Sequence, residues 1–164
     1  MSLKPSYPSK LQLHDSCSQC AKAISELLES MGASIKLTSD SDECNPVITG
    51  RINTSASTEG SVTIYGNYDI NCRDANASGW KSYPFELTAI DGNFYGCGVS
   101  ESKGPLVSVI QAVRELIIDG SLSVNVNFVI GENLGMSVIL VCTSQPLLDV
   151  ILFGLESRRR TRTR

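Results

Sequence analysis

Apolar residues recur at helical spacing in two segments. The first segment covers residues 14–32, and its apolar positions are Cys17, Cys20, Ala21, Ile24, Leu27, Leu28 and Met31. This spacing predicts an amphipathic helix with Asp15 or Ser16 as its N-cap and Gly32 as its stop. The second segment has Pro105 at the first helical position and ends at Asp119 and Gly120. Its apolar stripe consists of Leu106, Val109, Ile110, Val113, Leu116 and Ile117.

Shorter apolar runs, several of them rich in β-branched residues, predict strands between and after these helices. The runs are residues 34–37, 46–52, 61–65, 122–130, 138–142 and 149–155. A hairpin is predicted over residues 84–96, with its turn at Asp91 and Gly92, and residues 1–13 are expected to be irregular. Strands that alternate with helices predict one α/β domain over residues 14–157, a three-layer fold with a mostly parallel sheet and flanking helices.

Polar side chains gather in three loops, two of which follow predicted strands. The loops are "GNYD" (66–69), "GCGVSESKG" (96–104) and "GEN" (131–133), and their acids and amides are Asn67, Asp69, Glu101, Glu132 and Asn133. In α/β sheets, functional groups collect beyond the carboxyl ends of the strands. These residues therefore indicate a metal site or an acid/base site, and the alternative is that each is a solvated turn residue.

Charge is unevenly distributed along the 164 residues. The chain has 14 basic and 17 acidic residues and a net charge of -3, and five of its arginines lie in residues 158–164. The rest of the chain is therefore acidic, which disfavours nucleic acid binding across a folded face. The basic tail is predicted to be disordered, with polyanion binding or targeting as the alternative.

Cysteine and histidine add little to the candidate chemistry. Cys17 and Cys20 form a CxxC pair with no second pair or histidine cluster nearby, so small core residues are favoured over a structural zinc site. The lone histidine, His14, lies at the start of the first predicted helix, where a surface or capping role is favoured. With no apolar leader and no apolar segment of spanning length, the expectation is a cytoplasmic protein with reduced thiols.

One long motif block resembles a known family. The segments "YGNYDI" and "GWKSYPFELTAIDGNFYGCGVSESKGPLVSVIQAV" are similar to the M20 family of zinc exopeptidases, in particular its carnosinase-like and fungal glutathione-degrading branch. The resemblance runs from about residue 12 to residue 137. It implies a two-zinc site that hydrolyses dipeptides or small amides, in which the metals activate a bridging water. It also implies a lid domain and a final metal-binding histidine further downstream.

The resemblance assigns a role to each of the polar loops. The metal-binding histidine of the family falls on Asn67, and the aspartate that orients this histidine falls on Asp69. The bridging aspartate falls on Glu101, which keeps the charge but adds a methylene. An amide is a poor substitute for imidazole at zinc, so the first of these positions is the weakest.

The last loop admits two alignments. In the better one, Glu132 is the general base and Asn133 stands at a metal-binding glutamate; a slip of one residue sets Asn133 at the base and Leu134 at the ligand. Both alignments lose at least one carboxylate. Beyond residue 137 the match weakens, and an alignment that deletes the connecting helix places Thr143 at the fourth ligand.

The expected function is therefore that of a partial M20 hydrolase domain, impaired by ligand loss and truncation. The alternatives are an active zinc-dependent dipeptidase or aminoacyl hydrolase, a non-catalytic subunit that binds a full-length homologue, and an unrelated binding module. The expected partners are a small peptide substrate and a homologous full-length subunit, with no nucleic acid and no membrane.

Overall fold

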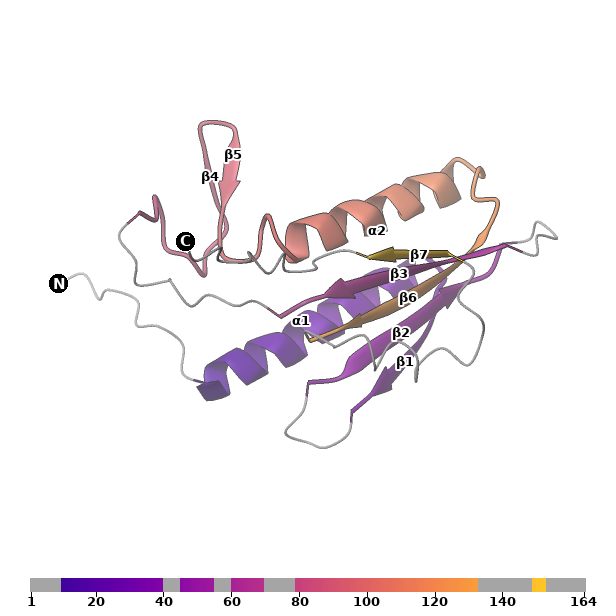
Figure 1. Cartoon of the computed structure of the whole chain (residues 1–164), viewed down its shortest axis with the longest axis horizontal. Helices are drawn as coiled ribbons and strands as arrows, with labels where there is room; N and C mark the ends of the chain where they lie inside the picture. The colour runs from indigo at the N-terminus through magenta and orange to yellow at the C-terminus, as the bar shows by residue number, and fades with distance from the viewer. Residues whose placement is uncertain (1–9, 40–44, 55–59, 70–78, 133–148, 153–164) are drawn as a thin grey trace, which may run out of the picture.

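The computed structural model describes residues 10–39, 45–54, 60–69, 79–132 and 149–152 (Figure 1). These residues form α1 (Lys10–Ser30), β1 (Ser34–Thr38), β2 (Val47–Ile52), β3 (Ser61–Asn67), β4 (Thr88–Ile90), β5 (Asn93–Tyr95), α2 (Lys103–Ile118), β6 (Asn125–Gly131) and β7 (Asp149–Leu152). The strand predicted over residues 138–142 lies outside the described residues, as do the tail and residues 1–9.

Five strands form a mixed sheet in the order β1-β2-β6-β3-β7. Strand β3 pairs in parallel with both β6 and β7, whereas β1 with β2 and β2 with β6 are antiparallel pairs. The predicted α/β class is confirmed, but the parallel pairing is confined to three strands. The connection explains this difference, because β3 reaches β6 through the crossover helix α2, while a short connection joins β1 to β2.

Both helices pack on the same face of the sheet. The core on that face combines Leu28 of α1 and Ile110 of α2 with Ile64 of β3 and Phe128 of β6. Tyr65 and Val129 form a smaller buried cluster on the opposite face, with Val47 beside them. The described residues therefore build two layers where the sequence predicts three.

Helix α2 lies very close to strand β3. A Cβ atom added at Gly66 would stand 2.8 Å from Cδ1 of Leu106, which is itself 1% exposed. A side chain at Gly66 would therefore force the buried side chain of Leu106 to move. The contact lies one residue before the end of β3, in the polar loop "GNYD" that continues with Asn67.

The observed helix starts correct the predicted ones. Helix α1 begins at Lys10, so residues 10–13 are helical rather than irregular, and Asp15 and Ser16 lie inside the helix instead of capping it. Residues 10–13 (KLQL) are good helix formers, which extends the helix beyond its amphipathic segment. Helix α2 begins at Lys103, two residues before Pro105, which a helix tolerates because the N–H groups of its first turn have no intrahelical partner.

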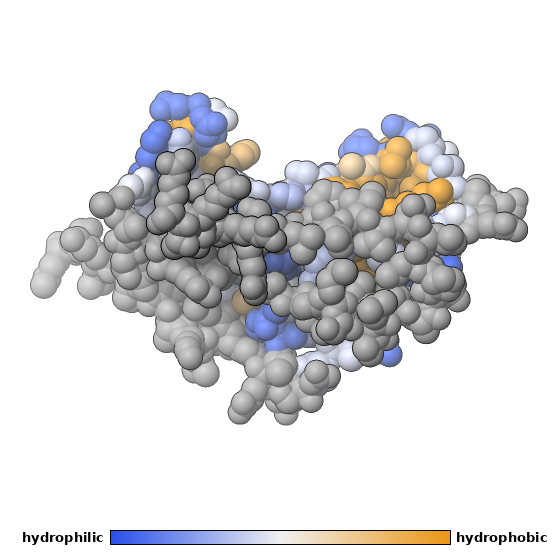
Figure 2. Space-filling view, in the orientation of Figure 1, coloured by the Kyte–Doolittle hydropathy of each residue, from blue (hydrophilic) through white to orange (hydrophobic). Residues whose placement is uncertain are grey.

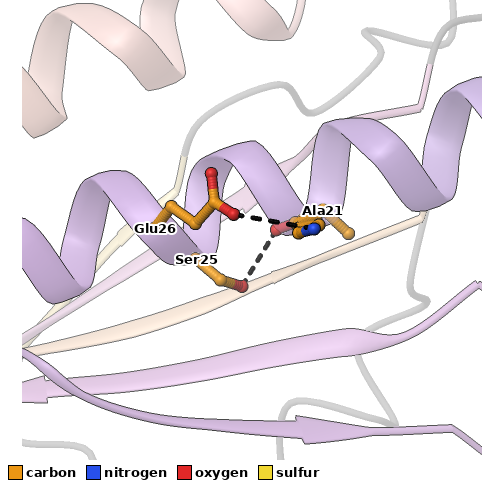
Figure 3. Close-up of polar contacts among 4 residues, drawn as sticks. Ala21, Ser25 and Glu26 are labelled. Carbon is orange, nitrogen blue, oxygen red and sulfur yellow. Dashed lines mark hydrogen bonds and ion pairs between the residues drawn. The ribbon is translucent and has the colours of Figure 1, made fainter.

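Other predicted features are confirmed. The hairpin of β4 and β5 turns at Asp91 and Gly92, both with positive φ, and Gly120 follows the end of α2 with φ of 66°. Within α1, the buried hydroxyl of Ser25 donates a hydrogen bond to the carbonyl oxygen of Ala21 at 2.9 Å, so it leaves no unmet donor in the core (Figure 3). Neither described helix is long and apolar enough to cross a membrane.

The three cysteines in the described ranges are of two kinds. Cys17 and Cys20 are free thiols that pack, half-buried, against the helix-side core, as the apolar stripe of α1 predicts. Cys97 is disulfide-bonded, so the expectation of reduced thiols does not hold at that position.

Candidate functional site

The carboxyl ends of β3 and β6 lie side by side. Asn67, the last residue of β3, is in register with Gly131, the last residue of β6. The backbone N–H of Tyr68 then donates to the carbonyl oxygen of Gly131 at 3.1 Å, which continues the pairing by one step. Parallel pairing therefore brings the loop that carries Asn67 and Asp69 next to Glu132, as the strand order of an α/β sheet predicts.

The loop before α2 is fastened to the end of β3. The hydroxyl of Ser102 donates a hydrogen bond to the backbone carbonyl of Asp69 at 3.2 Å, and it lies 3.5 Å from the carbonyl oxygen of Gly98. Ser102 is 7% exposed, whereas its neighbour Glu101 is exposed. The structure thus brings the backbone of this loop to the site and leaves the side chain of Glu101 facing solvent.

Glu132 is held by a residue that precedes the neighbouring strand, β2. The side-chain amide of Asn45, two residues before β2, donates a hydrogen bond to Oε1 of Glu132. This contact joins residues 87 positions apart. It restrains the carboxylate that the family resemblance assigns as general base.

Tyr68, which follows the last residue of β3, is buried beneath the candidate site. Its side chain is fully buried, and its hydroxyl donates to the carbonyl oxygen of Pro46 at 2.7 Å. Burial, and to a lesser extent the nearby charge of Glu132, raise the pKa of Tyr68 far above its ordinary range. The phenol therefore remains a neutral hydrogen-bond donor that connects the end of β3 to the start of β2.

The first half of α1 borders the same region. Burial raises the pKa of the Cys17 thiol, and the charges of Glu132 and Asp69 raise it further, while Lys103 acts in the opposite direction. Cys17 packs against the buried cluster that contains Tyr68, Leu106 and Ile130. Helix α1, the ends of β3 and β6, and the start of α2 therefore converge here.

The described residues do not fit a two-zinc centre. Asn67 presents a neutral amide, and Glu101 is exposed. Within the described ranges, no three His, Cys, Asp or Glu side chains lie close enough together to hold a metal ion. Asn133 and Thr143, the other predicted ligand positions, lie outside those ranges, and His14 lies within α1. A paired zinc site needs about three good protein ligands for each metal, which this donor set does not supply.

Sequence reasoning alone missed three residues that build the site. The position of Tyr68 could have been predicted, because successive side chains of a strand point to opposite faces. Continuing this alternation past Asn67 places Tyr68 on the helix side of the sheet, where it joins the core. The local sequence contains no indication of the roles of Ser102 and Asn45, since each forms a hydrogen bond with a residue distant in sequence. The predicted roles of Asn67, Asp69, Glu101, Glu132 and Asn133 remain predictions.

The sequence matches a family profile described as "Peptidase family M20/M25/M40" over residues 63–156, more than half of the chain. Human Beta-Ala-His dipeptidase is 37% identical over 86 residues, which are 52% of this chain and 17% of the relative. The probable di- and tripeptidase DUG2 of Saccharomyces cerevisiae is 41% identical over 69 residues, 42% of this chain and 8% of the relative. The matched segment is therefore less than a fifth of either relative.

Solved structures agree on the fold. Human carnosine dipeptidase 1 superposes with a TM-score of 0.62 at 27% identity, over 71% of this chain and 26% of that one. An M20 family metallo-carboxypeptidase, Sso-CP2 from Sulfolobus solfataricus, gives a TM-score of 0.68 at 25% identity, over 82% of this chain and 32% of that one. The mixed sheet and its helices thus correspond to part of the catalytic domain in these structures.

Proposed function

Because the chain belongs to peptidase family M20/M25/M40, we propose that it is an M20 hydrolase-like domain which does not hydrolyse dipeptides on its own. The family implies a metal cofactor, generally zinc, and small peptide substrates. This domain keeps the scaffold that presents such a site, with two strand ends and one helix start converging on it. The proposal is that its donor set no longer holds the metals.

The proposal rests on the amide side chain of Asn67, which stands where the family resemblance expects a metal-binding histidine. This residue ends β3 in register with the end of β6, which is the position where the fold delivers a side chain to the site. A carboxamide oxygen is neutral and binds zinc weakly, whereas an imidazole nitrogen is a preferred zinc ligand. Without that ligand, Asp69 has no imidazole to orient, and a retained base at Glu132 has no metal-bound water to deprotonate.

Metal content and dipeptide hydrolysis test this proposal together. The wild-type chain is expected to bind little zinc, to show no zinc-dependent rise in its melting temperature, and to leave β-Ala-His and Cys-Gly intact. Asn67→His is expected to raise the zinc bound per chain, and the combination with Glu101→Asp and Asn133→Glu to raise it further. A matched control is Asn93→His on the hairpin, an exposed position that is expected to leave zinc binding unchanged.

Two results would overturn the proposal. One is hydrolysis of either dipeptide by the wild-type chain that disappears in Asn67→Ala, which would establish an active zinc-dependent dipeptidase. The other is tight binding of two zinc ions by the wild-type chain with no dependence on Asn67.

A second candidate function is that of a non-catalytic subunit which binds a full-length M20 relative. The hairpin of β4 and β5 favours it, because one face of this two-stranded sheet carries Leu87, Ala89 and Phe94, all exposed. Leu87 and Phe94 are each 65% exposed. Figure 2 shows apolar surface on this projecting hairpin and again over α2. A two-stranded hairpin is only marginally stable in water by itself. Exposed apolar patches mark interaction surfaces, which favours a partner that covers this face.

A further inference from the structure

Cys17 and Cys20 lie on α1, next to the candidate site but outside the set of residues that the family resemblance assigns to it. Both are free thiols, half-buried, and both pack against the helix-side core. Because they are three residues apart on one helix, their side chains share a face of it, with Cβ atoms about 5–6 Å apart. Packing accounts for their apolar character, but the proposed function assigns no role to the two neighbouring thiols.

We propose that Cys17 and Cys20 form a binding site for a soft, two-coordinate cation of the copper(I) class. Metal–thiolate bonds are about 2.3 Å long, so an ion held linearly between two sulfurs separates them by about 4.6 Å. That span is within reach of side chains three residues apart on a helix. On binding, each thiol loses its proton and each sulfur forms one bond to the cation, so the oxidation state of the metal does not change.

The surroundings of the pair favour a soft cation over a hard one. The two thiols are the only cysteines of the described residues that are free, and within those residues no third carboxylate, histidine or cysteine completes a group with them. Zinc prefers four ligands in a structural site, whereas thiolate pairs select copper(I) by their softness. The apolar core on one side of the pair keeps water away from the bound ion.

The charges nearby also favour a cation. Burial raises the pKa of the Cys17 thiol, and the carboxylates of Glu132 and Asp69 raise it further, while Lys103 lowers it. The cation must therefore displace a proton that the metal-free thiol holds tightly. Two thiolates beside these carboxylates repel one another unless a positive ion lies between them. Copper(I) supplies that ion and halves the charge of the thiolate pair.

The test is competition for copper(I) with a chromophoric chelator, such as bicinchoninate, on the reduced full chain without oxygen. The wild-type chain is expected to take one copper(I) ion from the chelator into this site. Cys17→Ser and Cys20→Ser are each expected to weaken binding by more than roughly 100-fold, the upper range for loss of a supporting residue around a metal. Circular dichroism confirms that each variant is folded.

A double variant provides the matched control. Gln19→Cys with Cys20→Ser keeps the number of thiols on α1 but moves one to an exposed position two residues from Cys17, where it points away. This variant is expected to lose binding like Cys20→Ser, and Cys44→Ser is expected to bind like the wild type. Equal binding by Cys17→Ser and the wild type, or full binding by the double variant, would overturn the site.

Discussion

At the residue scale, Tyr68 shows how burial converts an ordinary side chain into a structural donor. Its raised pKa means that the folded state keeps a phenol proton which the unfolded chain loses near the ordinary value of 10.0. Above that pH the unfolded state binds fewer protons than the folded state, so stability is full below pH 10 and falls as the pH rises further. The slope that one such group contributes is at most about 1.4 kcal/mol per pH unit.

Tyr68→Phe is therefore expected to have two effects in urea unfolding. At pH 8 it loses the bond to the carbonyl oxygen of Pro46, which costs about 1 kcal/mol. Between pH 10 and 11 its stability is expected to fall less steeply than that of the wild type. Tyr95→Phe serves as the control, because its hydroxyl contacts only the exposed Lys81 among the described residues, and the wild-type slope should persist. Parallel alkaline slopes in Tyr68→Phe and the wild type would contradict this account.

At the scale of elements, Ser102 joins the start of α2 to the end of β3. It occupies the N-cap position but makes no capping bond with its side chain, because its hydroxyl donates to Asp69 instead. Ser102→Ala is expected to lower the free energy of unfolding by about 1 kcal/mol. Ser108→Ala, which removes an exposed hydroxyl from the same helix, is expected to change it by less than about 0.5 kcal/mol. Equal losses in chemical denaturation would show that the bond to Asp69 contributes nothing.

The elements also show what the sequence could predict and why. The apolar run over residues 61–65 and the body of α2 could be predicted because burial dictates their residues, although β3 continues two residues further, to Asn67. The start of α1 was missed, since residues 10–13 follow helix propensity without the amphipathic period. The antiparallel pairing of β2 with β6 was missed because strand order depends on partners distant in sequence. For the same reason, the sequence around Asn45 does not predict its hydrogen bond to Glu132.

At the scale of the whole molecule, the chain matches only part of its relatives. The hairpin of β4 and β5 projects from the sheet and helices (Figure 1), and one of its faces is apolar and exposed. If that face binds a full-length M20 relative, Phe94→Ser is expected to weaken the complex about tenfold, as the loss of a central aromatic contact does. Asn93→Ser, on the opposite face of the hairpin, is expected to leave affinity unchanged. Light scattering and titration of the chain with that relative measure both. A dimer of the chain alone that Phe94→Ser dissociates would instead assign the face to self-association, because the same apolar residues would then be covered by a second copy.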